Sequence, residues 1–162
     1  MNDITLRRFV DADQERILDT VTSNIVSTTY MLPDYEDRSN AIPLFLRLKD
    51  FSNDPDRYVR CISLDHTAIG YLNDVEIHGS EIELGYVIHP ACHNRGFMTA
   101  ALKLAIRELF DLGYQTVVCG AFEENKASQR VMEKAGMRRI ERIDQIDYRG
   151  KNHRCIYWKI TK

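Results

Sequence analysis

The sequence lacks the features that mark several classes of protein. Its four cysteines stand far apart and form no C-x-x-C pair, which argues against a zinc ribbon or a dithiol redox site. No stretch approaches the roughly 20 apolar residues that span a bilayer, and the first residues contain no apolar signal core. The formal net charge of -2 leaves no cationic surplus for nucleic acid. We therefore expect a cytoplasmic protein that binds neither metal, nucleic acid nor membrane.

Internal repeats, low-complexity tracts and Gly/Ser linkers are also missing. A chain of 162 residues buries about two-thirds of its unfolded surface, so it needs no disulfide or metal to stabilise a core. Hydrophobic residues make up 44% and charged residues 28%, which is ordinary globular composition. The sequence therefore predicts one domain over residues 1–162.

The apolar pattern predicts the order strand, two helices, three strands, helix, strand, helix, two strands. Strands are expected at 4–8, 57–64, 67–77, 81–88, 116–121, 137–147 and 152–160, and helices from 11 or 13 through 21, at 41–48, 94–112 and 125–135. Residues 24–40 are expected to form a loop. Short turns between the middle strands favour an antiparallel meander. The helix at 94–112 favours a right-handed crossover between parallel strands. The predicted fold class is α/β (α+β), with one mixed sheet.

The stretch from Ile82 to Thr99 carries the chemistry. A buried strand runs into a polar turn that contains Gly96 and then directly into a helix. The first turn of a helix has unpaired N–H groups and a partial positive charge, so it is a natural anion site. Glycine allows a phosphate to approach the backbone closely, and Arg95 offers a charge-assisted bond. The plainer alternative is that Gly96 only eases the turn. Neither a Walker loop nor G-x-G-x-x-G is present.

This stretch resembles the acyl-CoA-binding motif of GNAT acetyltransferases, Gln/Arg-x-x-Gly-x-Gly/Ala, which reads His93-Asn94-Arg95-Gly96-Phe97-Met98 here. Leu84-Gly85-Tyr86 before it, and the block from Asn125 to Met137 after it, are similar to the ribosomal-protein N-terminal acetyltransferase branch. The resemblance covers residues 82–160 well and the first 80 only by the order of elements. Two linked motifs at this separation are much more specific than either alone.

The resemblance implies the GNAT fold, a mostly antiparallel seven-stranded sheet with helices on both faces and a V-shaped opening between strands four and five. It implies acetyl-CoA as the acetyl donor. Backbone groups near Val87 and Ile88 would bond the pantetheine arm. The N–H groups that would hold the pyrophosphate belong to Arg95, Gly96, Phe97, Met98 and Thr99. His93 and Asn94 complete the loop. His93 and Met98 depart from the motif at positions that act mainly through the backbone.

The resemblance also implies direct attack of an amine on the thioester. The Ile88 amide would stabilise the oxygen that gains negative charge. Glu83 would be the general base, its alternative being a surface carboxylate in an ion pair. Asn125 would bond the pantetheine arm, cap a helix, or do both. Ser128 would protonate or stabilise the departing thiolate, its alternative being an ordinary helix serine. Many relatives carry a tyrosine general acid where this chain has Met132.

Several alternatives stay open at this stage. Met132 fits a CoA-binding regulatory or sensor module with little catalysis. A nucleotide-binding α/β domain or a purely structural interaction module are further readings. The acceptor is either a protein N-terminus or a small-molecule amine, and a homodimer is possible. The segment from Tyr30 to Tyr35 is expected to form a substrate-binding lip. The histidines at 78, 89 and 93 lack metal-ligand spacing, and Cys92 is expected to be a partly buried thiol rather than a reactive one.

Overall fold

The computed structural model describes residues 3–29 and 31–162. The strands of its sheet are β1 (Ile4–Arg7), β2 (Val59–Leu64), β3 (Thr67–His78), β4 (Glu81–Ile88), β5 (Thr116–Phe122), β6 (Arg138–Tyr148) and β7 (Lys151–Thr161). The helices are α1 (Gln14–Val21), α2 (Asn24–Thr29), α3 (Ile42–Ser52), α4 (Phe97–Asp111) and α5 (Lys126–Lys134), with short 3-10 turns η1 (Asp11–Asp13), η2 (Arg38–Ala41) and η3 (Pro90–Cys92). The order agrees with the predicted order except for one additional helix, α2.

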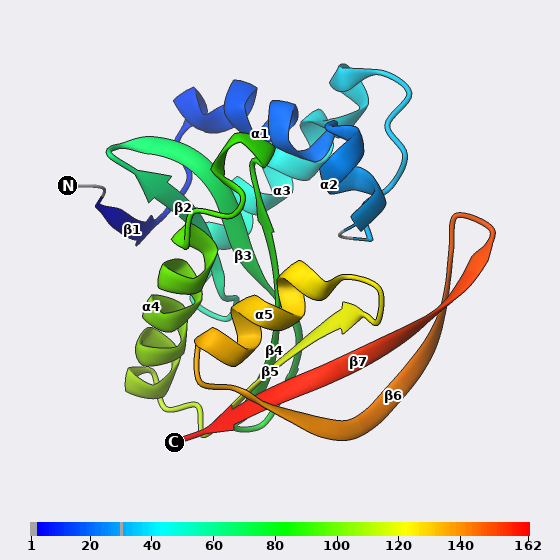
Figure 1. The fold of residues 1–162 in the computed structure, drawn as a ribbon. Coiled ribbons are helices and arrows are strands. Elements are labelled where there is room, and N and C mark those ends of the chain that lie inside the picture. The colour runs from blue at the N-terminus through cyan, green and yellow to red at the C-terminus, as the bar shows by residue number, and fades with distance from the viewer. Residues whose placement is uncertain (1–2, 30) are drawn as a thin grey trace.

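All seven strands belong to one sheet in the order β1-β2-β3-β4-β5-β7-β6 (Figure 1). The pair β4–β5 is parallel, because α4 carries the chain back across the sheet between them. The remaining pairs are antiparallel. The predicted mixed, mostly antiparallel α/β sheet is therefore confirmed.

Helices cover both faces of the sheet. On one face, Met98 and Leu102 of α4 and Met132 of α5 are buried in the same apolar cluster as Leu84 of β4. A second cluster includes Ile17 of α1 and Phe45 of α3, together with Tyr71 and Val87 of the sheet. Phe9 packs edge-on against Phe45 with ring centroids 5.9 Å apart. The sheet thus separates two cores.

The pairing of β4 with β5 stops before either strand ends. Paired positions run from Glu81 and Thr116 to Leu84 and Cys119. Both strands then continue, β4 to Ile88 and β5 to Phe122, without pairing to each other. Because β4 keeps its partner β3 up to Ile88, the sheet splits only on the β5 side. This split is the predicted V-shaped opening between strands four and five.

The expectation of a loop at residues 24–40 is wrong at its start, where the chain forms α2. Serine and threonine disfavour helix interiors because their side chains compete for backbone groups. Here the Thr29 hydroxyl donates to the Ile25 carbonyl oxygen over 2.6 Å, and the Ser27 N–H donates to the Ser23 carbonyl oxygen over 2.8 Å. These bonds are compatible with the helical backbone. Tyr30, part of the expected lip, lies outside the described residues.

The helix expected from residue 94 begins only at Phe97. Asn94 and Gly96 have left-handed backbones, with φ of 57° and 78°. Helical residues need negative φ, so the helix cannot extend back through these positions. Its other end agrees with the prediction, because Gly113 follows α4 with a φ of 107°.

Strands β6 and β7 form a long hairpin that extends beyond the rest of the sheet toward α2 (Figure 1). Arg149 and Gly150 form its two-residue turn with φ of 52° and 75°, as a tight hairpin requires. The Tyr148 hydroxyl donates to the carbonyl oxygens of Ser27 and Leu32. The end of the hairpin is thereby attached to α2 and to the segment that follows it. None of the helices in the described part of the chain is both long and apolar enough to cross a membrane.

Candidate active site

The turn between η3 and α4 presents a row of backbone N–H groups. The α4 helix starts with the Ala100 N–H donating to the Gly96 carbonyl oxygen over 3.1 Å, and no side chain caps it. Within residues 3–29 and 31–162, no protein atom accepts a hydrogen bond from the N–H groups of residues 95–99. Space around Gly96 is open where a Cβ would lie. An anion can therefore approach these N–H groups directly.

Two side chains of this stretch, those of His93 and Arg95, have defined contacts. The His93 N–H donates to the Pro90 carbonyl oxygen over 3.1 Å. Its ring Nε2 lies 3.0 Å from the Ile88 carbonyl oxygen and must donate to it. The guanidinium of Arg95 lies over the Phe97 ring at 4.7 Å. His93 thus holds the end of β4 against the turn rather than offering its amide.

The backbone of Ile88 faces the opening. The His89 N–H donates to the Ile69 carbonyl oxygen of β3 over 2.7 Å. Backbone groups of an antiparallel strand alternate in direction, so Val87, which pairs with Tyr71, also faces β3. The intervening Ile88 faces the other way, toward β5. Ile88 is consequently better placed than Val87 for a backbone hydrogen bond across the opening.

A cavity of about 410 Å³ passes through the opening between β4 and β5. It connects the α5 side of the sheet, where Asn125 and Ser128 line it, with the α3 side, where Leu44 and Leu48 line it. Its other lining residues are Thr29, Met31, Leu32, Tyr71, Asn73, Val75, Glu83, Leu84, Gly85, Tyr86, Val87, Gly120, Ala121, Phe122, Ile146, Cys155 and Tyr157. A ligand on the α5 side can therefore meet a second one on the α3 side.

Glu83 of β4 lines this cavity, and its side chain is 13% exposed. Its Oε1 atom is buried without a hydrogen bond from the described residues and lies 3.5 Å from Nη1 of Arg142. Burial raises the pKa of the Glu83 carboxyl above its ordinary value, and Arg142 opposes part of that rise. A buried carboxylate of raised pKa is suited to accept a proton.

The C-terminal hairpin surrounds Glu83 with groups that sequence reasoning missed. Arg142 of β6 pairs with Asp144 at 2.9 Å, and its guanidinium lies 3.8 Å above the Tyr157 ring. The Tyr157 hydroxyl donates to Oδ2 of Asp144 over 2.7 Å. Burial, foremost, raises the pKa of Tyr157. No local motif marks these residues, because only the pairing of β7 with β5, and of β6 with β7, brings them close to Glu83.

Gly120 makes room for this arrangement. A Cβ at position 120 would lie 2.6 Å from Cε1 of Tyr157 and 3.2 Å from Sγ of Cys155. Cys155 is buried in the cavity wall, and burial raises the pKa of its thiol. The absence of a side chain at Gly120 therefore allows the Tyr157 ring to lie against β5.

On the α5 side, Asn125 caps the helix as one of its two predicted roles requires. Its Oδ1 accepts the Ser128 N–H over 3.1 Å. The Tyr86 hydroxyl reaches across the opening and donates to the Ser128 carbonyl oxygen over 3.2 Å. Met132 is fully buried in the apolar core and does not line the cavity. Tyr86 is thus a phenol at the opening that sequence reasoning overlooked.

The described part of the chain contains no group of three His, Cys, Asp or Glu side chains that could hold a metal ion. Among the predicted residues, Glu83, Asn125 and Ser128 line the cavity, while residues 93–99 form the neighbouring turn. Cys92, which was expected to be partly buried, is buried.

Comparisons with known proteins agree with this geometry. The family model for the acetyltransferase (GNAT) domain matches residues 3–138, and no curated protein matches the sequence. Similar solved structures include a GNAT-family acetyltransferase from Bacillus anthracis, with a TM-score of 0.81, 20% identity and coverage of 99% of this chain and 96% of that one.

Two further structures resemble the fold. A spermidine N-acetyltransferase from Vibrio cholerae, in complex with CoA and spermine, has a TM-score of 0.81 and 16% identity. The match covers 98% of this chain and 95% of that one. A ribosomal-protein-S5-alanine acetyltransferase from Vibrio fischeri has a TM-score of 0.79, 14% identity and coverage of 99% and 96%. The predicted fold and enzyme class are confirmed. With its seven-stranded sheet split between β4 and β5 and the family model matched over most of its length, the chain belongs to the GNAT acetyltransferase family, whose members are acetyl-CoA-dependent N-acetyltransferases.

Proposed function

We propose that this protein transfers the acetyl group of acetyl-CoA directly to a primary amine, with both substrates bound at once. One observation carries the proposal: a turn of unpaired N–H groups adjoins a cavity that passes through the sheet and contains a buried carboxylate. The N–H groups of the turn can donate to a diphosphate. The unpaired end of β4 can bond the extended pantetheine arm of CoA. Bound acetyl-CoA supplies an activated acetyl group. Holding both substrates in one cavity lowers the barrier by proximity.

In this proposal each group of residues has a separate role. N–H groups of residues 95–99 hold the diphosphate, and Asn125 lies where it can contact the pantetheine arm. Glu83 accepts the proton that the incoming ammonium must lose. The Ile88 N–H stabilises the carbonyl oxygen as negative charge grows on it, which is worth about 3 kcal/mol of barrier for one such donor. Two expectations stay predictions: that the protein forms a homodimer, and that it belongs to the ribosomal-protein N-terminal acetyltransferase branch.

The test is a thiol-release assay with acetyl-CoA and a panel of primary amines, paired with calorimetry of acetyl-CoA binding. We expect binding, together with amine-dependent release of the CoA thiol. Binding without release for every amine would favour the sensor module that Met132 suggested. Failure to bind acetyl-CoA would remove the basis of both readings.

Ser128 is proposed to stabilise the departing thiolate. Replacing Ser128 with alanine removes its hydroxyl but keeps the N–H that Asn125 binds and the carbonyl that Tyr86 binds. We expect the turnover number to fall about tenfold, equivalent to ~1.4 kcal/mol, with acetyl-CoA affinity nearly unchanged. Steady-state kinetics and calorimetry measure the two quantities. Unchanged turnover would assign Ser128 a purely structural role.

Replacing Arg142 with glutamine tests the electrostatics of the proposed base. Arg142 holds down the pKa of Glu83, so its loss should raise that pKa further. A base works when deprotonated, which is the state above its pKa. The rising limb of the profile of kcat/KM against pH should therefore move to higher pH.

An exposed arginine supplies the control for that measurement. Arg130 of α5 has no contact with Glu83, and its replacement by glutamine should leave the profile unchanged. A shift to lower pH in the Arg142 variant would contradict the assignment of Glu83.

A further inference from the structure

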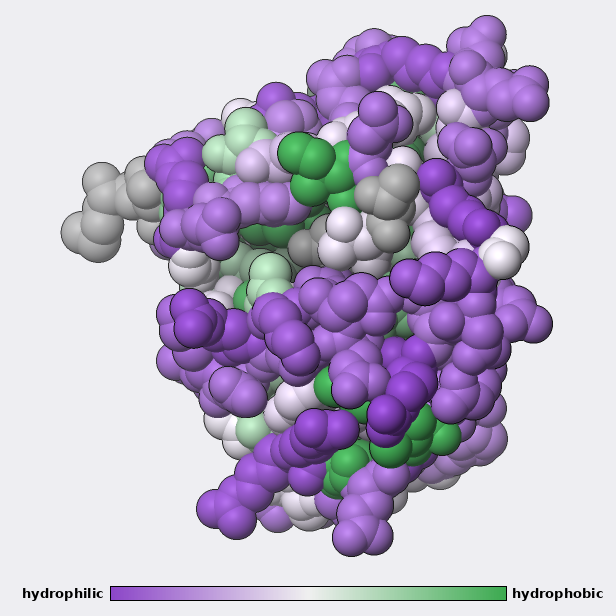
Figure 2. All heavy atoms as spheres, turned by 45° about the vertical axis from the view of Figure 1, so that its right-hand side comes forward, coloured by the Kyte–Doolittle hydropathy of each residue, from purple (hydrophilic) through white to green (hydrophobic). Residues whose placement is uncertain are grey.

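The α3 side of the cavity is mostly apolar, although the uncharged polar residues Thr29 and Asn73 also line it. Leucines from α3 and from the segment after α2, together with Tyr71, Val75 and Ile146, form its walls. Glu83 is the one charged side chain among the described residues that line it. The outer surface differs, because hydrophilic side chains dominate the face shown in Figure 2. Any acceptor that reaches Glu83 must therefore leave water for mostly apolar surroundings.

Resting on the proposed function, we propose that the acceptor is a compact primary amine with one positive charge and an uncharged, apolar body. One buried carboxylate can compensate one ammonium group. A second cation of a polyamine would be desolvated without a partner, which is costly. An amino acid would need a cation for its carboxylate. The nearest candidate, Arg142, is held by Glu83, Asp144 and the Tyr157 ring and does not line the cavity.

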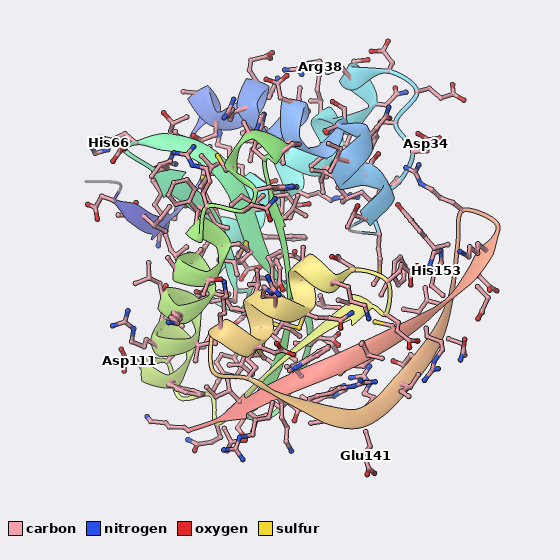
Figure 3. The ribbon with its side chains drawn as sticks, in the orientation of Figure 1. Asp34, Arg38, His66, Asp111, Glu141 and His153 are labelled. Atoms are coloured by element: carbon pink, nitrogen blue, oxygen red, sulfur yellow. The ribbon has the colours of Figure 1, made fainter. Side chains whose placement is uncertain are left out.

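The end of the hairpin restricts the cavity further. Tyr148 bonds the carbonyl oxygens of Ser27 and Leu32, and Arg149 lies 3.7 Å from Asp34. Figure 3 shows Asp34 beside the end of the hairpin, with His153 lower on the same hairpin. Leu32, in the segment after α2, and Ile146, on β6 of the hairpin, both line the cavity. A polypeptide acceptor would have to displace the bridge, whereas a compact amine would not.

The first test compares kcat/KM for 2-phenylethylamine, spermidine, free alanine and a peptide that begins with alanine, at saturating acetyl-CoA. We expect 2-phenylethylamine to exceed each of the others by about tenfold or more, the range that buried unpaired groups enforce. A higher value for any of the other three would overturn the acceptor class and leave acetyl transfer standing. Transfer to none of the four, with acetyl-CoA bound, would contradict both proposals.

A second test adds a charge to the wall. Leu44 is partly buried and lines the cavity, whereas Leu46 on the same helix is 48% exposed and does not. Leu44→Glu should raise kcat/KM for spermidine relative to 2-phenylethylamine by about tenfold, because a second carboxylate partners the second cation. Leu46→Glu should leave the ratio unchanged.

A second variant guards against failure of Leu44→Glu to fold. Val75 also lines the cavity but is 59% exposed, so Val75→Glu should be tolerated and should shift the ratio in the same direction. Circular dichroism confirms that each variant is folded. If both folded variants keep the original ratio, the amine does not bind against this wall and the acceptor class is overturned.

Discussion

Replacing Glu83 with glutamine is expected to lower kcat/KM for the amine by about 10²- to 10³-fold, within the range found for general bases. Glutamine has nearly the same shape but cannot take up the proton that the ammonium must lose. Burial has already raised the pKa of this carboxyl, which brings it closer to working pH. Acetyl-CoA affinity should hardly change, because Glu83 lies away from the turn at residues 93–99. Steady-state kinetics across pH, with calorimetry for acetyl-CoA, measures both.

Glu81 provides a matched control for this experiment. It lies two positions earlier on the same strand, is exposed, and does not line the cavity. Replacing Glu81 with glutamine should therefore leave kcat/KM within a factor of about two. Equal turnover of the Glu83 variant and the unaltered protein at every pH would show that another group, or water alone, takes the proton.

Replacing Gly70 with alanine is expected to lower the free energy of unfolding by about 3 kcal/mol, the upper part of the range for overpacking. A Cβ at position 70 would lie 2.1 Å from the Val87 carbonyl oxygen and 2.9 Å from Cα of Ile88. Both are backbone atoms of β4, in the middle of the sheet, so no side-chain rotation relieves the clash. Strand β3 would have to separate from β4 beside the opening. Urea denaturation measures the loss.

Gly79 separates this clash from the general effect of adding a methyl group. It lies in the turn between β3 and β4 with a φ of 58° and nothing within 4 Å of an added Cβ. Its replacement by alanine should cost about 1 kcal/mol, from the left-handed backbone alone. If the Gly70 variant is no less stable than the Gly79 variant, β4 accommodates the methyl group and the close approach is not limiting.

Local sequence patterns predicted most of the fold. Alternating apolar residues placed β4 at Glu81–Ile88, the same bounds that the structure has. Helices were expected to end at residues 112 and 135, and the glycines that follow, Gly113 and Gly136, both have positive φ. These features depend on neighbouring residues and on the periods of helix and strand, which a sequence displays directly. Prediction failed at α2 because its serine and two threonines favour loops by propensity. Propensity is a weak guide where tertiary packing decides.

In the candidate site, too, local motifs were predictable and long-range contacts were not. Two motifs predicted the turn at residues 93–99 and the roles proposed for Glu83 and Ser128. Within each motif the residues are close together in the sequence. Arg142, Tyr157 and the bridge from Tyr148 to Ser27, whose partners stand 121 positions apart, form no motif.

The sequence by itself therefore determined every strand and α-helix except α2, the glycine-containing turn before α4 and the enzyme family. Only the tertiary structure decided which side chains surround the carboxylate and how apolar the acceptor side is. The physical reason is that β7 lies in the sheet between β5 and β6 and pairs with β5 beside the opening. That long-range pairing, invisible to local periodicity, brings the C-terminal hairpin over the opening.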